Sequence, residues 1–345
     1  MSDQERALLD AARSGDQDAY AGLIEPHRSA LHAHCYRMLG SLHDAEDALQ
    51  ETLFRAWKGL SGFDGGRPIR PWLFKIATNV CLDAIAKRPK RVLPSDRGAS
   101  SVPEAGPGKA FVENIWLEPY PDEFLGLETR YETPDARYEQ RESVELAFVA
   151  ALQHLPALQR AVLILREVLG FSAREVAESL ETSAAAVNSA LQRARVTVEE
   201  RMPAQTQQAT ARSLGDAGLR AVVQRYVDAW EHRDVDAITA LLVEDARFAM
   251  PPFPNWFSGR EVVVAFIVAT GRPRLRHIVT QANGQPAIGW YIWNGPANAF
   301  VPTSIEVLTL EGERVREIVA FASPDLFAAF GLPAQLAGDY ANAPT

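Results

Sequence analysis

The sequence has few cysteines and no long apolar run, and both shortages limit what the protein can be. Only two of its 345 residues are cysteine, Cys35 and Cys81, and neither has the spacing of a metal ligand. We therefore expect reduced core residues and no disulfide framework, metal or cofactor. No stretch approaches the roughly 18 consecutive apolar residues of a membrane span. Residues 1–6 are polar with no apolar signal region behind them, which favours a cytoplasmic protein without membrane contact.

The chain also lacks net positive charge. Its 35 Lys and Arg residues against 44 Asp and Glu residues give a net charge of -9, which argues against a protein that coats nucleic acid unaided. Basic residues nevertheless concentrate between positions 67 and 97, where eight of them accompany only Asp83 and Asp96. Such a local basic patch can contact phosphates when a larger partner holds the chain on nucleic acid.

Composition and periodicity divide the chain into three units, because its length exceeds one average domain. Two units repeat apolar residues at helical spacing. The third adds strand-like runs at residues 275–282, 287–293, 299–310 and 314–321, with turn signals at Asn283-Gly284 and Glu311-Gly312. We therefore predict two all-α domains followed by an α+β domain. The predicted segments are residues 1–92 (helical), 93–134 (linker), 135–202 (helical), 203–215 (linker), 216–335 (α+β) and 336–345 (tail).

Residues 171–195 have the pattern of a helix-turn-helix. Ser172 and Glu175 have capping-box spacing at the start of the first helix. Val187 and Leu191 give the second helix an apolar face, and its other faces are polar. A second helix of this kind can enter a DNA groove. An ordinary helical hairpin has the same pattern, so the rest of the chain must decide between the two.

Three carboxylates share one face of the predicted helix that follows Ser41. Asp44, Asp47 and Glu51 fall at positions i, i+3 and i+7, which brings them together on a helix surface. Such a run is commonly a solvated acidic face. An acidic face of this kind is also a binding site for a basic partner.

In these motifs and their order, the sequence resembles the extracytoplasmic-function (ECF) sigma factors of the sigma-70 class. Residues 44–57 resemble their region 2.2, residues 63–67 and 70–79 their regions 2.3 and 2.4, and the helix-turn-helix their region 4.2. The order and approximate spacing agree over residues 1–200. The resemblance implies a transcription initiation factor that binds core RNA polymerase and promoter DNA and is not itself an enzyme.

The resemblance also implies which residues do this. Those expected to contact core polymerase are Asp44, Asp47, Gln50, Glu51 and Phe54. Those expected at the -10 element, where a basic surface and an aromatic platform would hold opened DNA, are Phe63, Arg67, Arg70, Lys75, Asn79, Asp83, Lys87 and Arg88. Those expected to contact the -35 element from the second helix are Ser183, Ala185, Asn188, Ser189, Gln192, Arg193 and Arg195.

The recognition helix departs from the common family pattern at two places. Glu181 stands at a turn where many relatives have Gly, and Asn188 and Ala190 replace a basic pair. Fewer phosphate contacts imply weaker electrostatic binding. Asn188 and Gln192 have side chains that can hydrogen-bond adenine.

The third unit resembles SnoaL-like domains of the cone-shaped α+β fold shared with ketosteroid isomerase and NTF2-like proteins. Some ECF sigma factors carry such a domain at the C-terminus. The resemblance extends to two short elements expected to dock domains together, one with Trp116, Leu117 and Pro119, the other with Pro324 and Asp325. It implies a regulatory module whose fold leaves room for a small-molecule ligand.

Two other functions remain open from the residues. The first is an isomerase or cyclase in which Asp245, His277, Tyr291 and Trp293 line a pocket, although no pair of them has diagnostic spacing. The second is a stand-alone DNA-binding regulator with a ligand-binding domain, which would require a dimerisation element and more positive charge. Neither of these is visible in the sequence.

Overall fold

The chain folds into two compact units, seen in a computed structural model that describes residues 2–111, 115–126, 139–271 and 274–337. The first unit comprises Met1–Arg91 with Phe124–Met202, and the second comprises Val92–Glu123 with Pro203–Thr345. In the described residues, no helix is both long enough and apolar enough to cross a membrane.

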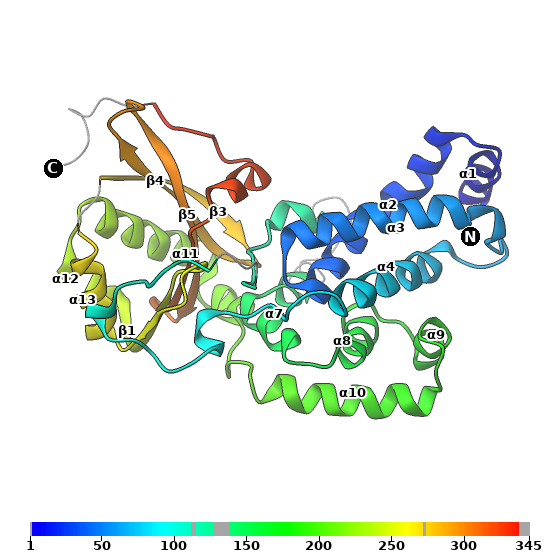
Figure 1. Cartoon of the computed structure of the whole chain (residues 1–345), viewed down its shortest axis with the longest axis horizontal. Coiled ribbons are helices and arrows are strands. Elements are labelled where there is room, and N and C mark those ends of the chain that lie inside the picture. Colours follow the sequence, from blue (N-terminus) through cyan, green and yellow to red (C-terminus); the bar gives the residue numbers. More distant parts are fainter. Residues whose placement is uncertain (1, 112–114, 127–138, 272–273, 338–345) are drawn as a thin grey trace. The chain divides into compact units, whose positions relative to one another are not determined.

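The first half of the helical unit contains four helices, drawn in blue in Figure 1. The caps follow from the sequence: Ser2 forms a capping box with Glu5, the Ser41 hydroxyl accepts from the Asp44 N–H, and Gly40 ends the second helix with a left-handed φ of 68°. Both cysteines are buried and neither forms a disulfide. The helices are α1 (Asp3–Arg13), α2 (Gln17–Leu39), α3 (Leu42–Gly59) and α4 (Ile69–Ile85).

The second half of this unit ends in the predicted helix-turn-helix. Ser172 and Glu175 form both hydrogen bonds of a capping box, which confirms the predicted helix start. Glu181 lies in the turn at φ 54°, a left-handed conformation that favours Gly. The family preference for Gly at this turn thus has a steric reason. The helices are α7 (Leu146–Gln153), α8 (Ala157–Leu163, continued by a π-helical turn at Ile164–Val168), α9 (Ala173–Ser179) and α10 (Ala184–Glu199).

Two buried arginines join the halves of the helical unit. The Arg37 Nε donates to the Ser143 carbonyl at 2.9 Å, and Arg160 on α8 donates to the carbonyl of Met38 on α2. Both guanidinium groups are almost fully enclosed, at 1% and 4% exposure. Because hydrogen bonds offset much of the cost of burying a cation, these bonds hold α7 and α8 against α2, beside which they lie in Figure 1.

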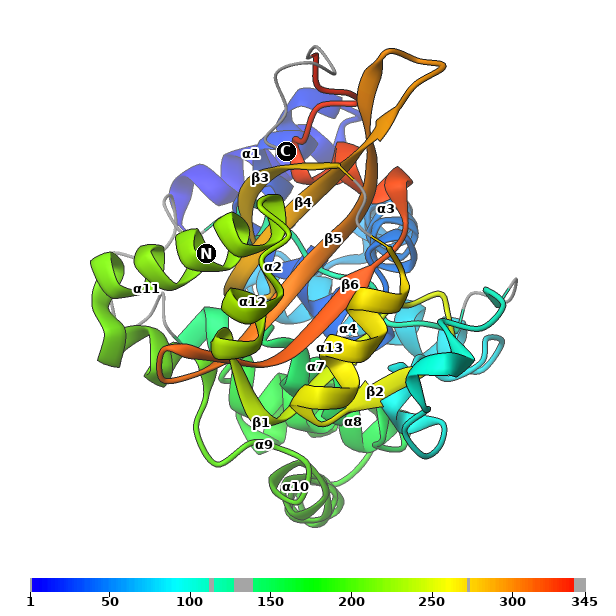
Figure 2. The same cartoon turned by 90° about the vertical axis from the view of Figure 1, so that its left-hand side faces the viewer.

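The second unit is a six-stranded sheet with helices on one face, as Figure 2 shows. The strand order is β2-β1-β6-β5-β4-β3, with β1 parallel to β6 and the other pairs antiparallel. The strands are β1 (Leu242–Ala249), β2 (Trp256–Ser258), β3 (Leu275–Ala282), β4 (Gln285–Asn294), β5 (Ala299–Glu311) and β6 (Arg314–Phe321); the helices are α11 (Gln207–Glu231), α12 (Val235–Leu241) and α13 (Arg260–Ala269).

The structure groups the chain differently from the predicted linkers. Residues 92–123, most of the predicted first linker, belong to the sheet-containing unit. Helix α11 begins inside the second predicted linker and is interrupted at Gly215, where φ is 65°. Residues 127–134 of the first linker, residues 135–138 of the predicted second helical segment and most of the predicted tail (338–345) lie outside the described residues.

Candidate polymerase and nucleic-acid interface

Helix α3 exposes one continuous stripe that matches most of the predicted polymerase-binding set. Asp47, Gln50, Glu51 and Phe54 are spaced at i, i+3, i+4 and i+7, and all four are exposed or half-exposed. Phe54 is 52% exposed, with the Lys58 ammonium 4.1 Å from its ring centroid. An exposed aromatic ring on the same helix face as two carboxylates is suited to a protein interface, where aromatic side chains are enriched.

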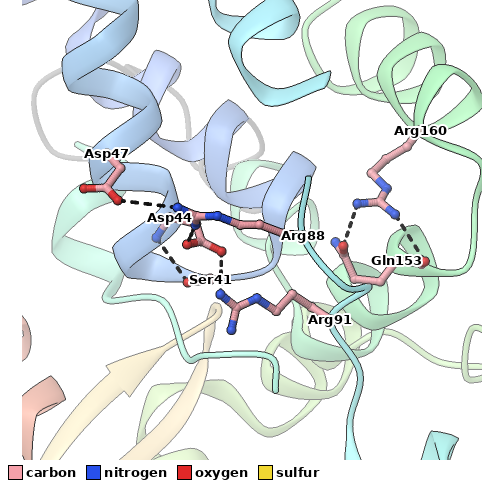
Figure 3. A network of polar contacts seen from close by, with 7 residues as sticks. All are labelled: Ser41, Asp44, Asp47, Arg88, Arg91, Gln153 and Arg160. Atoms are coloured by element: carbon pink, nitrogen blue, oxygen red, sulfur yellow. Dashed lines mark hydrogen bonds and ion pairs between the residues drawn. The ribbon is translucent and has the colours of Figure 1, made fainter. Parts of the chain in front are cut away.

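Asp44, the first predicted residue of this set, is enclosed instead. Figure 3 shows its carboxylate between the guanidinium groups of Arg88 and Arg91. The Arg91 Nη2 lies 2.5 Å from Asp44 Oδ2, and Arg88 also pairs with Asp44. Only 9% of the Asp44 side chain and 5% of the Arg91 side chain are exposed. In this conformation the Asp44 carboxylate is therefore occupied by the two arginines. The Arg88 guanidinium is likewise occupied and is not free to contact DNA.

Three basic residues of the predicted -10 set contact the helix-turn-helix half of the same unit. Arg70 donates to the Leu169 carbonyl at 2.8 Å and stacks over the Phe171 ring at 4.5 Å. Lys75 lies 3.2 Å from the Glu181 carboxylate. Arg67 lies 3.8 Å from Asp64 and 4.0 Å from Glu178. The Lys75 and Arg67 ion pairs are exposed and therefore weak, so a DNA phosphate can replace them, whereas the Arg70 hydrogen bond is partly buried.

The other members of the predicted -10 set differ in exposure. Asn79 and Lys87 are exposed to solvent. Phe63 is buried at 7% exposure, with its ring centroid 4.8 Å from that of Trp72, so this ring supports the loop. Asp83 pairs with Arg55 at 3.2 Å.

The second helix of the helix-turn-helix buries one face and exposes the predicted contact residues. Val187, Ala190, Leu191 and Ala194 are buried. The Ser183 hydroxyl caps the helix by accepting from the Ala186 N–H at 3.1 Å, and Arg195 pairs with Glu167 at 2.5 Å. The exposed positions on the remaining faces include Ala185, Asn188, Ser189, Gln192 and Arg193.

The first predicted docking element packs within the sheet-containing unit. Trp116 and Leu117 are buried, as is Pro119. Further along, the Tyr120 N–H donates to Asn283 Oδ1 at 2.9 Å, and the Asn283 N–H donates to the Tyr120 carbonyl at 2.8 Å. The segment between the two helical halves of the chain is thereby tied to the β3–β4 turn.

The second docking element is divided between solvent and core. Pro324 and Asp325 are exposed at the start of a 3₁₀ segment (Pro324–Phe330). The next two residues, Leu326 and Phe327, are buried, and the Phe327 ring packs edge-on against Tyr291. The buried part of this element is thus the pair of residues after the predicted ones.

The four side chains considered for catalysis do not converge. Asp245 pairs with Arg316 at the surface. His277 lies 2.6 Å from Glu231. The Tyr291 hydroxyl donates to the Pro333 carbonyl at 2.9 Å, and the Trp293 ring packs against Phe300.

Sequence reasoning missed the most perturbed carboxyl of this unit, Glu306 on β5. Its Oε2 accepts from the Tyr226 hydroxyl at 2.8 Å and from Trp290 Nε1 at 2.7 Å. Burial raises the pKa of Glu306 to about 7, and the two donors oppose that rise without cancelling it. The alternation of side chains along the strand could have indicated that Glu306 is buried, because Glu306 shares a face with the core residues Leu308 and Leu310.

Together the geometry defines a class of protein. An acidic and aromatic helix face, a basic surface and a helix-turn-helix in one unit are the parts of a DNA-binding initiation factor that works with a larger partner. Comparison with known proteins identifies the family. The sigma-70 region 2 model matches residues 23–91, the sigma-70 region 4 model residues 145–198, and the SnoaL-like domain model residues 223–318.

Individual relatives agree with these matches. The ECF RNA polymerase sigma factor SigG of Mycobacterium tuberculosis is 42% identical over 330 residues, covering 94% of this chain and 86% of that protein. The RNA polymerase sigma factor NccH of Alcaligenes xylosoxydans xylosoxydans is 32% identical over 193 residues, covering 55% of this chain and 90% of that protein. The crystal structure of Mycobacterium tuberculosis SigJ has the same fold, with a TM-score of 0.58 at 22% identity, covering 91% of this chain and 99% of that one.

The chain belongs to the ECF RNA polymerase sigma factors, and it carries a SnoaL-like C-terminal domain. Members of this family direct RNA polymerase to promoters and are transcription factors, not enzymes. The remaining question is which residues of this chain perform each step.

Proposed function

We propose that the exposed stripe of α3 is the surface that binds core RNA polymerase. The observation that carries this proposal is the exposure of Phe54 on the same helix face as the carboxylates of Asp47 and Glu51. A basic partner surface would pair with the carboxylates and cover the ring, which would remove exposed apolar area from water. Asp44 would join the stripe only when it leaves Arg88 and Arg91.

A binding experiment with matched variants tests this assignment. The affinity of the fluorescently labelled full chain for purified bacterial core polymerase is measured for the wild type, Asp47→Asn and Phe54→Ala. Truncating a buried aromatic anchor typically costs about 2 kcal/mol or more, so Phe54→Ala should bind at least about tenfold more weakly. The control is Glu46→Gln, an exposed carboxylate on the same helix but about 100° away from Asp47. Equal affinity of Phe54→Ala and Glu46→Gln would refute the assignment.

The predicted -10 residues would bind opened promoter DNA after exchanging their present partners. Arg67, Arg70 and Lys75 now contact Glu178, Leu169 and Glu181. A phosphate forms charge-assisted hydrogen bonds with a guanidinium group, which are stronger than a hydrogen bond to a neutral carbonyl. Promoter binding is therefore expected to separate α9 and its turn from this basic surface.

The exposed side chains of α10 would contact the -35 element. Asn188 and Gln192 lie one helical turn apart and are both exposed, which suits them to hydrogen bonds with base edges in the major groove. Arg193 would contact phosphate. We place the chain with the polymerase and the chromosome in the cytoplasm, because a sigma factor acts there.

The C-terminal domain would regulate the sigma regions and catalyse no reaction. Its support is the connection between the regions: residues 92–123 pair with the sheet through Tyr120 and Asn283. A domain that holds this connection restricts how far the two regions can separate on a promoter. The separation of Asp245 from His277 and its neighbours argues against an isomerase site. A small-molecule ligand stays a prediction.

The regulatory role is tested by releasing the connection without shortening the chain. Asn283→Gly keeps a residue that accepts the positive φ of 57° and removes the acceptor for the Tyr120 N–H. We expect run-off transcription by core polymerase with this variant to differ from that with the wild type. Identical activity, with the segment shown by proteolysis to be released, would reject the regulatory role.

A further inference from the structure

A pocket of about 270 Å³ lies in the helical unit beside the α3 stripe. It forms where the end of α4 and the residues after it meet the loop between α7 and α8. Four basic side chains line it together with one carboxylate and one imidazole. The charged and titratable lining residues are Asp44, Arg88, Lys90, Arg91, His154 and Arg160.

Basic side chains outnumber acidic ones in the lining of this pocket. Arg88, Lys90, Arg91 and Arg160 contribute four cations, Asp44 contributes one carboxylate, and Asp47, outside the lining, lies 3.9 Å from Arg88. Lys90 Nζ lies 2.8 Å from His154 Nδ1, so the imidazole accepts from the ammonium and adds no negative charge. In a chain with a net charge of -9, this concentration of positive charge is a local feature and not a consequence of composition.

Arg160 makes the imbalance most evident. It is 4% exposed, and its Nη atoms donate to neutral acceptors, among them Gln153 Oε1 at 2.6 Å and the Leu155 carbonyl at 3.3 Å. In the described ranges no carboxylate pairs with it, and its buried Nε makes no hydrogen bond. Burial lowers the pKa of Arg160 to about 10. Buried cations are normally paired with an anion.

Arg88 and Arg91 already hold an anionic group in the manner expected of a ligand site. Figure 3 shows the Asp44 carboxylate between the two guanidinium groups, with Arg160 and Gln153 on the opposite side. Planar guanidinium groups bind carboxylate and phosphate oxygens in the same paired geometry. A doubly charged phosphate would offset the excess positive charge better than Asp44 can.

We propose that this pocket binds a phosphate group, with Arg88, Lys90 and Arg91 as its ligands and Asp44 as the internal anion that competes for them. Binding would release the Asp44 carboxylate to the α3 stripe. The same chemistry has two sources, a free phosphorylated compound and the backbone of bound DNA. The site itself does not depend on the proposed polymerase contacts.

The test uses pyrophosphate as the probe, titrated into the full chain by calorimetry at constant ionic strength. Removing one charged hydrogen-bond partner typically weakens binding about tenfold or more, so Arg88→Gln should bind pyrophosphate about tenfold more weakly. Asp44→Asn removes the competing charge and should bind it several-fold more tightly. Arg225→Gln is the control, because Arg225 is also a surface arginine paired with a carboxylate, Glu313, at 3.0 Å.

The gain in Asp44→Asn separates this proposal from a structural role, since a misfolded variant would lose affinity. Pyrophosphate binding by Asp44→Asn no tighter than that of the wild type would overturn the proposal. A short non-promoter duplex then distinguishes the sources. If the affinity for the duplex falls in Lys90→Gln and rises in Asp44→Asn, the source is a DNA phosphate. If the affinity for the duplex is unchanged in both variants, the source is a free phosphate compound.

Discussion

The substitution Glu306→Gln should change how the stability of the C-terminal unit depends on pH. Glu306 lies inside the sheet, where register pairs it with Ile288 on β4 and Ala320 on β6. Burial raises its pKa from 4.5 to about 7. A raised pKa means that the folded state holds the proton more tightly than the unfolded chain does. The associated stability is complete below about pH 4.5 and is lost as the pH rises through about 7.

The size of the effect follows from the difference between the two pKa values. At about 1.4 kcal/mol for each pKa unit, ionisation of Glu306 costs the folded unit about 3 kcal/mol above pH 7. Glutamine carries no charge at any pH, and its amide oxygen can accept from Tyr226 and Trp290 as the carboxylate does. Relative to the variant, the wild type should therefore lose most of this stability between pH 5 and pH 8.

Native-state hydrogen exchange in increasing urea measures the stability of the C-terminal unit alone, using peptides from β4 and β5. The free energy of unfolding is compared between the wild type and Glu306→Gln at pH 5 and at pH 8. Other groups, such as Glu317, whose pKa is also raised by burial, contribute equally to both proteins. A difference between the proteins that is the same at both pH values would show that Glu306 does not titrate with a raised pKa.

Three further substitutions test other parts of the account. Burial lowers the pKa of His34 to about 3, so the wild type loses stability as the pH falls below about 6.5. Between pH 7 and pH 5, His34→Gln should lose about 2 kcal/mol less folding free energy than the wild type. An acid-unfolding midpoint by circular dichroism that is the same in both proteins would contradict this. Glu181→Gln frees Lys75 from an exposed pair 3.2 Å long and should tighten binding of -10 fork DNA by roughly twofold to fivefold, whereas equal affinity would show that the pair does not compete with DNA. Asn283→Gly leaves the Tyr120 N–H without its acceptor at a cost of about 1–3 kcal/mol. Limited proteolysis within residues 92–111 and 115–123 should therefore be faster than in the wild type. Cleavage at the wild-type rate would argue against docking of this segment on the β3–β4 turn.

Local patterns predicted much of the fold. The capping residues Ser41 and Ser172 begin helices as predicted, and four of the strands lie within a few residues of the predicted runs. Caps, turns and periodicity act over a few residues, so the sequence displays them directly. Strand β1 was missed because Glu244 and Asp245 interrupt its apolar alternation.

Long-range pairings in the site could not be predicted. Asp44 has the spacing of an exposed acidic stripe, yet Arg88 and Arg91, more than forty residues away, enclose it. Residues 92–123 have the composition of a linker, but hydrogen bonds to Asn283 tie them to a distant sheet. These contacts depend on how helices and strands pack, which one sequence without its fold does not specify.

We propose that this chain binds core polymerase through the α3 stripe and so directs it to promoters. The most direct measurement is transcription in vitro by purified bacterial core polymerase on a library of randomised promoter fragments, with and without the full chain. We predict new transcripts with fixed start sites below shared -10 and -35 sequences, lost when Asp47→Asn and Phe54→Ala are combined. Transcripts no different from those of core polymerase alone, or unchanged by the double substitution, would contradict the account.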